Sequence, residues 1–467
     1  MRFILLTISF FVLAILLGFL SSQIPPSVLI WGGLAFAIFS ISFINIELGL
    51  YILIFSMLLS PEIAVGQTYG ASMGRGVTLR LEDFLLAIIG FSWFAKNAVN
   101  KELGLFLKTP LNRAILFYAL ACIVATGFGI IGGRVNPRTG FFFVLKYVEY
   151  FIVFFMMVNH VKSAEQIKRF VFFLLLTCLI TALIGMLQIP GGGRVSAPFE
   201  GQTGEPNTFG GYLLFMGAIA AGMLSTAEKT RTRHLLIGLI VAIIPPFLFT
   251  LSRSSYLAFI PALLVLGYLM KKRVVVIGII LFALAVSPLF LPFQIKGRIS
   301  YTFTQPKHRD QLQIGGVRLD TSTSARITSW KEALVDWTRH PLLGYGVTGY
   351  HFVDAQFPRV LVETGAVGFV AFIYLLYSIG RLSLSNLREL KNSYFRGITI
   401  GFIAGYAGLL FHAIGANTFI IVRIMEPFWF FAGIIVVIPM LEEKTLFKSE
   451  EVLRPQLNPS NKSPSLS

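Results

Sequence analysis

Apolar runs of about 20 residues, the length that crosses a lipid bilayer as a helix, follow one another along most of the chain. Within each run the apolar residues are continuous rather than alternating. This pattern predicts helices instead of the strands of a membrane barrel, because backbone polar groups in lipid must be paired within their own segment. We therefore expect an all-α, polytopic transmembrane helix bundle of about 14 spans. The predicted spans cover residues 3–20, 28–44, 47–60, 82–98, 113–132, 141–160, 168–189, 206–225, 234–251, 254–270, 273–293, 361–380, 396–414 and 426–441.

The two ends of the chain differ from this pattern. The run 3–20 follows Arg2 and lacks a small-x-small cleavage site, which favours a first span over a removable signal peptide. The tail after Leu441 is polar and ends in PQLNPSNKSPSLS, a composition typical of disorder. We divide the chain into N-terminal transmembrane helices (1–189), a core (190–441) with a long outer loop (294–360), and a disordered cytoplasmic tail (442–467).

Composition supports a membrane protein and narrows its chemistry. The chain is 55% hydrophobic and 13% charged, with a mean hydropathy of +0.76, which is more apolar surface than a soluble domain could bury. The net charge of +17 is explained by Lys and Arg that flank membrane helices, so no nucleic-acid partner is expected. Cys122 and Cys178 both lie in apolar runs and imply neither a disulfide nor a thiolate metal site.

Basic residues in alternate loops predict the orientation of the chain. The positive-inside rule places such loops in the cytoplasm, and they alternate correctly with the spans if both termini are cytoplasmic. The cytoplasmic clusters are Lys96, Lys101, Lys108 and Arg113; Lys162, Lys168 and Arg169; Lys229, Arg231 and Arg233; Lys271, Lys272 and Arg273; and Arg381, Arg388, Lys391 and Arg396. The segments left outside are 61–81, 133–140, 190–205, the junction near 252, 294–360 and 415–425.

The basic residues of these outer segments are mostly arginines, and the topological rule does not account for them. They are Arg75, Arg80, Arg134, Arg138, Arg194, Arg253, Arg298, Arg309, Arg318, Arg326, Arg339, Arg359 and Arg423. A two-pronged anion such as a diphosphate or a carboxylate selects arginine over lysine, because the guanidinium donates two parallel hydrogen bonds. The outer side is therefore predicted to hold an anionic ligand.

Arg253 lies in the segment TLSRSSY at 250–256, between two apolar runs. A charge near the centre of a span is costly. One interpretation is an interfacial arginine whose side chain reaches the lipid headgroups. The other is a buried contact to a phosphate, with Ser252 and Ser254 as further donors.

The long outer loop is predicted to contain one amphipathic helix. Hydroxyl groups in the segment TSTS at 321–324 can cap its start, and Pro341 ends it. Arg326 is expected in the first turn, where a cation opposes the helix dipole unless an anion is bound there. An apolar stripe predicts packing against the membrane or the bundle, and it consists of Ile327, Trp330, Leu334 and Trp337.

Acidic residues are scarce on the outer side, so Asp354 and Glu363 stand out. Either could be solvated or salt-bridged, for instance to Arg359, or could take a proton from an attacking hydroxyl beside an arginine-bound substrate. His351 is a second candidate for that base. The sequence has no paired-carboxylate or His/Cys cluster that would hold a metal, so metal-independent chemistry without a cofactor is expected.

Other candidates lie where segments enter the membrane. Glycine-containing stretches at 191–193 and 201–204 indicate turns. Arg194 and Asn207 lie beside them, and each either belongs to such a turn or lines a polar cavity at the membrane entrance. The glycines of HPLLGYG at 340–346 are expected only to permit a turn. His412 is expected to make a polar contact within its span, and Arg423 is expected to form an ion pair with Glu426.

Four segments together resemble the O-antigen ligase and polymerase superfamily of bacterial envelope glycosyltransferases. They are GRVSAPFEGQTGEPNTFGGYL at 193–213, TLSRSSYLAF at 250–259, SARITSWKEALVDWTRHPLLGYG at 324–346 and DAQFPRVLVETGAVGF at 354–369. Their order, spacing and flanking spans fit the superfamily from about residue 190 to 380. The N-terminal spans match only in hydropathy.

The resemblance implies a GT-C-like bundle in the bacterial inner membrane, with its active site on the periplasmic face. The donor would be a glycan on undecaprenyl diphosphate, with a glycan acceptor, membrane lipids and a chain-length regulator as partners. Asp354 and Ala355 stand where the ligases carry a His-Asn pair, and many polymerases carry Asp there, which favours a polymerase. The implied catalytic residues are Asp354, Arg326 and Arg253. We add Arg194, Asn207, His351, Arg359 and Glu363 as candidate substrate-binding residues.

Two other functions remain open at this point. A ligase would move finished polymer onto a lipid A-core or protein acceptor. A transporter of lipid-linked glycans would carry charges deep within its spans and two related halves, and neither is clear in the sequence. The large outer loop with its ordered helix favours an enzyme whose site faces the periplasm.

Overall fold

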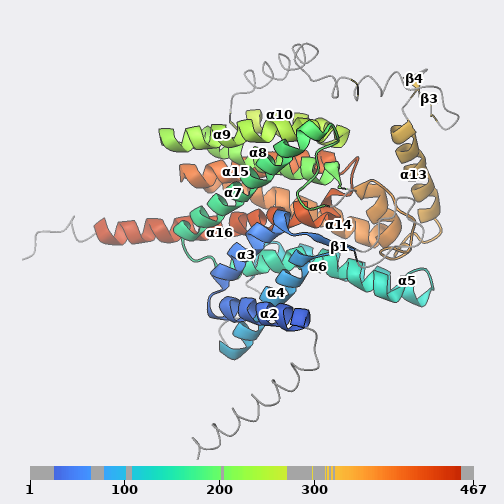
Figure 1. The fold of residues 1–467 in the computed structure, drawn as a ribbon, viewed down its shortest axis with the longest axis horizontal. Coiled ribbons are helices and arrows are strands. Elements are labelled where there is room, and N and C mark those ends of the chain that lie inside the picture. The colour runs from blue at the N-terminus through green and yellow to red at the C-terminus, as the bar shows by residue number, and fades with distance from the viewer. Residues whose placement is uncertain are drawn as a thin grey trace, which may run out of the picture.

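The computed structural model describes residues 26–64, 78–100, 108–200, 204–270 and 321–453, together with residues 297, 311, 313–314 and 317–318. The predicted spans 3–20 and 273–293 lie outside these residues, as do Arg75, Arg298 and Arg309. The described chain is almost entirely helical (Figure 1). Its helices are α2 (Pro26–Ile44), α3 (Ile46–Leu59), α4 (Leu81–Asn100), α5 (Asn112–Ile131), α6 (Pro137–His160), α7 (Ala164–Gln188), α8 (Pro206–Thr226), α9 (Thr230–Phe249), α10 (Arg253–Leu269), α13 (Thr321–Trp337), α14 (Gln356–Glu389), α15 (Ser393–His412) and α16 (Val422–Leu453).

Short elements complete the described fold. The 3-10 turns η1 (Ile189–Gly191) and η3 (Thr418–Ile420) follow α7 and α15. Two antiparallel pairs of strands are present, β1 (Glu62–Ala64) with β2 (Thr78–Arg80), and β3 (Gln313–Ile314) with β4 (Val317–Arg318). These hairpins are too small to change the all-α class.

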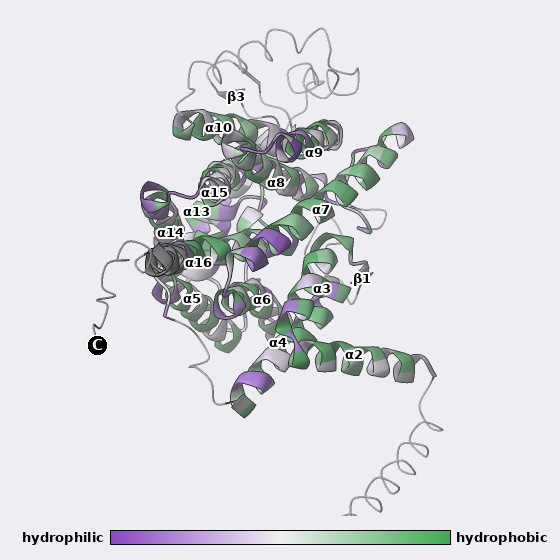
Figure 2. Ribbon diagram, turned by 90° about the vertical axis from the view of Figure 1, so that its left-hand side faces the viewer, coloured by the Kyte–Doolittle hydropathy of each residue, from purple (hydrophilic) through white to green (hydrophobic). Residues whose placement is uncertain are grey.

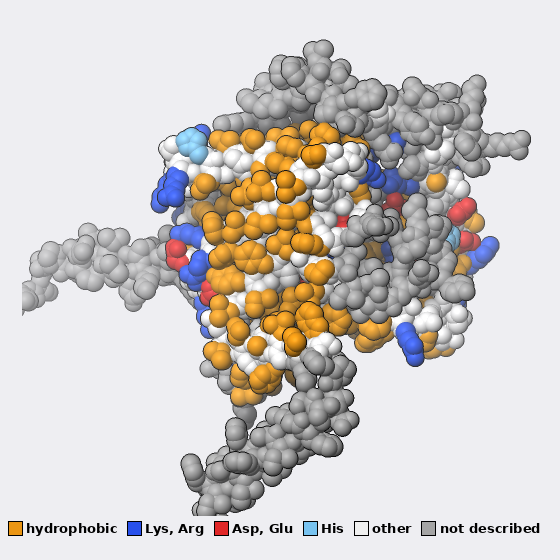
Figure 3. Space-filling model, in the orientation of Figure 1, with side chains coloured by type: hydrophobic (Ala, Val, Ile, Leu, Met, Phe, Trp, Pro, Cys, Tyr) orange, Lys and Arg blue, Asp and Glu red, His pale blue; other side chains and the backbone are white. Residues whose placement is uncertain are grey.

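Every predicted span within the described residues overlaps a helix. Eight of these helices, α5 to α9 and α14 to α16, are long and apolar enough to cross a membrane. Helices α3 and α10 are apolar but shorter, with 14 and 17 residues. The described part of the chain therefore forms a multi-pass membrane protein with eight candidate spans, fewer than the 12 predicted spans that fall in these residues. Figure 3 shows the corresponding belt of hydrophobic side chains, with charged side chains gathered at its two rims.

The loops meet at two opposite ends of the bundle. At one end Lys96 Nζ donates to the carbonyl of Ile44 at 2.8 Å, and Arg169 pairs with Glu47 at 2.8 Å. These contacts join loops that the basic clusters assign to the cytoplasm. At the other end α13 lies across the ends of the long helices (Figure 1). We call this second end the α13 end; its loops are the ones that the sequence assigns to the outside.

The centre of the bundle is built on close helix packing. The membrane-spanning part of helix α16, within Val422–Glu443, is almost fully enclosed, and α8 packs on α15 through glycines. A Cβ on Gly222 would collide with the backbone of Gly401 and with the carbonyl of Gly397. Small residues let membrane helices approach this closely, which maximises van der Waals contact where no hydrophobic effect separates helix from lipid. In contrast, α2 lies at the edge of the bundle (Figure 2).

Helix α14 is two helices joined at a sharp bend. Gly365 has φ 65° and ψ −171°, so the short helix 356–364 ends there and the membrane-spanning part begins after it. The predicted span 361–380 missed this break. The break matters because the short helix carries two of the candidate residues, Arg359 and Glu363, and begins just after a third, Asp354.

Candidate active site

A salt bridge between Arg326 and Asp354 lies at the α13 end. Arg326 Nη2 donates to Asp354 Oδ2 at 3.0 Å, and the two side chains are about one quarter and one third exposed, at 25% and 32%. The contact joins α13 to the residues just before α14. A guanidinium and a carboxylate that share a partly open surface can bind an anion and accept a proton within the same small volume.

The position of Arg326 on its helix differs from the prediction. Helix α13 begins at Thr321 rather than after Ser324, so Arg326 lies in the second turn. Ser324 is fully buried inside the helix instead of capping it from outside. The argument from an unfavourable helix dipole therefore loses its basis, and the placement of Arg326 is explained by Asp354 instead.

Asp354 is held in place by the turn between α15 and α16, which we call the 413–419 turn. Asn417 Nδ2 donates to the carbonyl of Val353 at 2.9 Å, on one side of Asp354. On the other side, the backbone N–H of Gln356 donates to the carbonyl of Ala413 at 3.0 Å. Sequence reasoning missed Asn417 and Gln356, because nothing local marks a residue that anchors a distant loop.

The same turn brings the start of α10 toward Arg326. Ser254 Oγ donates to the carbonyl of Gly415 at 3.1 Å. A Cβ on Gly415 would touch Ser254 Oγ and would lie 4.0 Å from Arg326 Nη1. Arg253, the first residue of α10, is partly buried beside this point. Arg326 thus lies near the N-terminus of α10, where Arg253 is the first residue and where free amides favour an anion.

Arg194 and Asn207 both support the start of α10. Arg194 Nε donates to the carbonyl of Thr250 at 3.0 Å, and its Nη2 donates to that of Leu251 at 3.4 Å. Leu251 has a φ of 50°, which is unfavourable for a branched residue. Asn207 Oδ1 accepts from Ser252 Oγ at 2.7 Å. Arg194 therefore stabilises a strained turn, and both residues fix the segment that presents Arg253.

Arg359 and Glu363 pair with each other inside the protein. Arg359 Nε lies 3.1 Å from Glu363 Oε1, and the residues are only 8% and 4% exposed. The guanidinium also lies 5.6 Å from the ring centroid of Phe352. Glu363 Oε1 in addition accepts from the backbone N–H of Thr348 at 3.3 Å. This geometry gives the pair a role in fixing the loop that precedes Asp354.

The glycines near this pair do more than permit turns. Tyr345 N–H donates to Val362 O at 3.0 Å, and Ala366 N–H donates to Pro341 O at 2.8 Å, so two backbones run side by side. Gly344 and Gly365 both have a φ of 65°, and a Cβ on either would overlap the backbone of the other segment. The segment HPLLGYG at 340–346 therefore packs against the segment ETG at 363–365, backbone to backbone. This contact fixes the chain after α13 to the bend in α14.

His351 faces Glu332 of α13 rather than the Arg326–Asp354 pair. Its Nε2 is 3.9 Å from Glu332 Oε2, its side chain is 47% exposed, and its ring lies over that of Tyr350. Tyr350 in turn donates to Asp336 at 2.7 Å, and burial together with this bond raises the pKa of Tyr350. Among the described contacts, none joins His351 to Arg326 or Asp354.

The buried face of α13 is rotated by one residue relative to the predicted apolar stripe. Trp330 and Trp337 pack on a small cluster as expected, but Leu334 is 47% exposed and Ala333 is buried in its place. The small side chain of Ala333 lets α13 approach the segment of Asp354 closely. The cluster consists of Ala333, Val353, Ala355 and Val362.

The arginines of the outer segments do not all gather at one site. Arg423 is fully buried and contacts segments other than that of Asp354. Its Nη1 donates to Pro198 O at 2.9 Å, and its Nη2 donates to Ser60 O at 3.0 Å. Arg423 also pairs with Glu200 at 3.5 Å, a partner that the predicted ion pair with Glu426 did not include. Other arginines are surface or structural residues, namely Arg80, Arg138 and Arg339.

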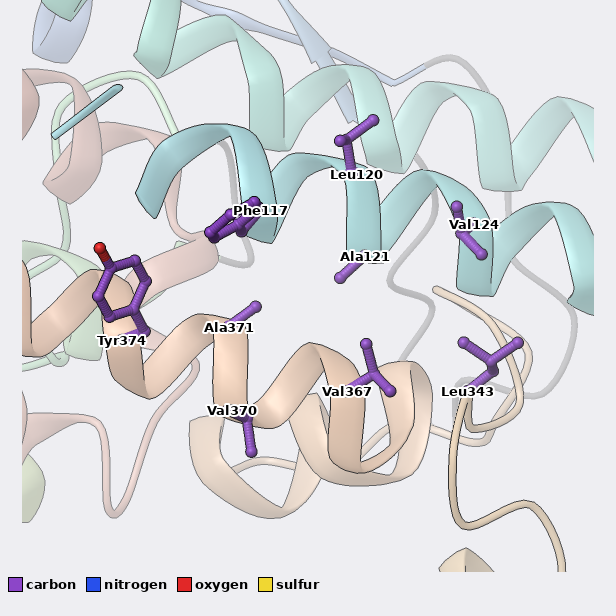
Figure 4. A pocket seen from close by; sticks show the side chains of 9 residues that line it. All are labelled: Phe117, Leu120, Ala121, Val124, Leu343, Val367, Val370, Ala371 and Tyr374. Atoms are coloured by element: carbon purple, nitrogen blue, oxygen red, sulfur yellow. The ribbon is translucent and has the colours of Figure 1, made fainter. Parts of the chain in front are cut away.

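An apolar groove of about 550 Å³ lies between α5 and α14 (Figure 4). Phe117, Val124, Val370 and Tyr374 are among the residues that line it. It contains no charged side chain and lies on membrane-spanning helices, so we assign it no chemistry. In the described part of the chain, no group of three or more His, Cys, Asp or Glu side chains has a geometry that could hold a metal ion.

A family model described as O-antigen ligase matches residues 246–373. The match begins at the end of α9 and ends in the membrane-spanning part of α14. The chain carries an O-antigen ligase domain. No curated protein matches the chain.

The O-antigen ligase domain contains most of the candidate site, including Arg253, Arg326, Asp354 and the Arg359–Glu363 pair. The match makes these residues similar to membrane enzymes of the O-antigen ligase or polymerase type, over less than half of the chain. Two supports of the site lie outside the matched residues, on either side of the domain. These are the segment with Arg194 and Asn207, and the 413–419 turn.

Proposed function

We propose that the protein is a periplasmic-face polymerase that joins oligosaccharide repeat units carried on undecaprenyl diphosphate. The observation that carries the proposal is the Arg326–Asp354 contact at the α13 end, beside the N-terminus of α10. Two arginines suit a diphosphate, because each can donate paired hydrogen bonds to its oxygens. A carboxylate beside them suits the proton transfer that glycosyl transfer requires.

In the proposed reaction the acceptor hydroxyl attacks the anomeric carbon of the donor glycan. The new C–O bond forms as the bond from that carbon to the diphosphate oxygen breaks, and undecaprenyl diphosphate leaves with the electron pair. Asp354 takes the hydroxyl proton. Arg253 and Arg326 stabilise the negative charge that grows on the leaving diphosphate. A single direct attack inverts the anomeric centre, and the leaving group needs no nucleotide.

The salt bridge gives this reaction an order of events. In the absence of a donor, Asp354 and Arg326 neutralise each other at a partly exposed surface. A diphosphate competes for the guanidinium and carries more negative charge than a carboxylate. Binding of the donor therefore draws Arg326 away and leaves Asp354 as the acceptor for the incoming hydroxyl.

A polymerase is favoured over a ligase by the residues at 354–355. The resemblance places a His-Asn pair here in ligases, whereas this chain has Asp354 followed by Ala355. Ala355 is fully buried in the cluster beneath α13, so it offers no polar group to a substrate. The description of the family model keeps a ligase as the second candidate.

Deletion of the gene followed by analysis of lipid-linked glycans separates the two candidates. Loss of a polymerase leaves single repeat units on undecaprenyl diphosphate. Loss of a ligase leaves long polymer that is not attached to its final acceptor. A chain-length regulator is the expected partner only in the first case, and unchanged glycans would count against both.

A further inference from the structure

A chain of hydrogen-bonding side chains runs from the interior of the bundle to the start of α8. His412 Nδ1 lies 2.8 Å from Thr418 Oγ1, and His412 Nε2 lies 3.2 Å from Ser255 Oγ. Ser255 Oγ also donates to Ser252 Oγ at 2.8 Å, and Ser252 Oγ donates to Asn207 Oδ1 at 2.7 Å. The first four residues are buried, and only Asn207 is partly exposed.

The chain has one direction. Ser252 donates its hydroxyl hydrogen to Asn207, and Ser255 donates its own to Ser252. A serine has a single hydroxyl hydrogen, and with it directed to Ser252 we assign Ser255 Oγ as the acceptor of His412 Nε2–H. His412 also forms a hydrogen bond with the backbone of Asn207. In the neutral ring Nδ1 is then an acceptor, and the hydroxyl of Thr418 donates to it. The N–H of His412 thus fixes the direction of the Ser255–Ser252 and Ser252–Asn207 hydrogen bonds.

The consequence appears at Asn207. Because Oδ1 of Asn207 is taken by Ser252, its amide nitrogen is the atom left on the opposite side, where the residue is partly exposed. Ser252 directly precedes Arg253, so Asn207 contacts the residue next to Arg253 at the start of α10. Two N–H donors beside an arginine recognise an acceptor-only group, such as a phosphate oxygen.

We propose that His412 is a positioning residue, which orients the amide of Asn207 so that its N–H groups donate to the diphosphate of the lipid-linked donor. The proposal rests on the proposed function, since it assigns a further contact to the same donor. Asn207 touches the substrate, whereas His412, Ser255 and Ser252 act through it.

The packing of α8 agrees with this role. A Cβ on Gly210 would overlap Ser255 Oγ, and a Cβ on Gly211 would lie 3.2 Å from Cε1 of His412. The two glycines therefore let the backbone of α8 approach α10 and α15 where the chain passes. Apolar residues would fill such a core without any partner to satisfy, so the buried hydroxyls and imidazole indicate a function beyond packing.

Binding of undecaprenyl diphosphate to the purified full-length protein tests the inference. His412→Leu removes the donor to Ser255, and Asn207→Asp places a negative charge where the amide donors were. We expect both to weaken binding by about 10-fold or more, the effect of losing a hydrogen bond to a charged group. His412→Gln retains an N–H donor and should recover affinity to within about threefold of the wild type. Thr399→Val, at a buried threonine that bonds only within α15, is the matched control.

The outcomes separate this inference from the proposed function. If His412→Leu does not fold, Ser255→Ala breaks the same chain at a smaller side chain and should weaken binding in the same way. Folded His412→Leu or Ser255→Ala protein with wild-type affinity would overturn the inference, as would a His412→Gln protein as weak as His412→Leu. Failure of the wild-type protein to bind undecaprenyl diphosphate would instead overturn the proposed function.

Discussion

Arg326 Nη2 lies 3.0 Å from Asp354 Oδ2, although the two residues are 28 positions apart. The contact connects a helix that crosses the end of the bundle with the start of a broken membrane helix. Each partner is secured separately, Arg326 by the packing of α13 and Asp354 by the 413–419 turn. The pair therefore presents an anion-binding group and a proton acceptor in a defined relation.

Asp354→Asn should lower glycan transfer by about 10²- to 10⁴-fold, because the amide cannot accept the hydroxyl proton. Asp354→Glu keeps a carboxylate and should retain a measurable part of the activity. The rate of chain elongation by purified protein in proteoliposomes provides the measurement. His351→Ala serves as the comparison and should remain active. If His351→Ala is inactive while Asp354→Asn is active, the base is His351.

Arg194→Ala should reduce transfer only by about two- to tenfold, the effect of losing hydrogen bonds to two carbonyls. In contrast, Arg253→Ala should abolish it, because Arg253 is proposed to contact the diphosphate. Both proteins should insert into the membrane in normal amounts. Complete loss of transfer in a well-folded Arg194→Ala protein would show that Arg194 contacts the substrate itself.

Alanine at Gly344 or Gly365 should destabilise the protein by about 1–3 kcal/mol each, from left-handed backbone and from overlap with the opposite segment. Gly191→Ala is a control in open space. Thermal unfolding in detergent measures the difference. Equal melting temperatures for Gly344→Ala and Gly191→Ala would contradict the crossing of the two segments.

Arg423→Leu should destabilise the fold by about 3–5 kcal/mol, because it leaves buried Glu200 without this partner. Arg423 also joins the end of α3 to the loop before α8 through two carbonyls, so loss of folded protein rather than of catalysis is expected. The amount of protein in the membrane is the readout. Exposed Arg138→Ala should be unaffected, and a folded but inactive Arg423→Leu protein would place Arg423 in the site.

Sequence periodicity was sufficient to predict the helices, because membrane spans are set by local composition. It also predicted the Arg359–Glu363 pair as one alternative, since residues four apart on a helix are neighbours. The start of α13 was misplaced because several hydroxyls could cap it, and the phase of its apolar face depended on how closely Ala333 lets the helix approach.

The contacts that bring the site residues together could not be predicted from the sequence. Arg326 and Asp354 were both singled out, but nothing local shows that they pair. Arg423 was assigned to nearby Glu426, whereas its partner Glu200 is distant in sequence. Likewise, the crossing of Gly344 and Gly365 depends on two backbones meeting in space. Long-range contacts of this kind are fixed by the packing of whole helices rather than by any one segment.

The most direct measurement of the central claim is elongation of lipid-linked repeat units by Arg326→Ala protein in proteoliposomes. Arg339→Ala, on the exposed surface just beyond α13, is the matched control, since Arg339 is 70% exposed and pairs with Asp336. We predict that both proteins fold and that only the control makes polymer. Polymer made at a normal rate by Arg326→Ala would contradict the account.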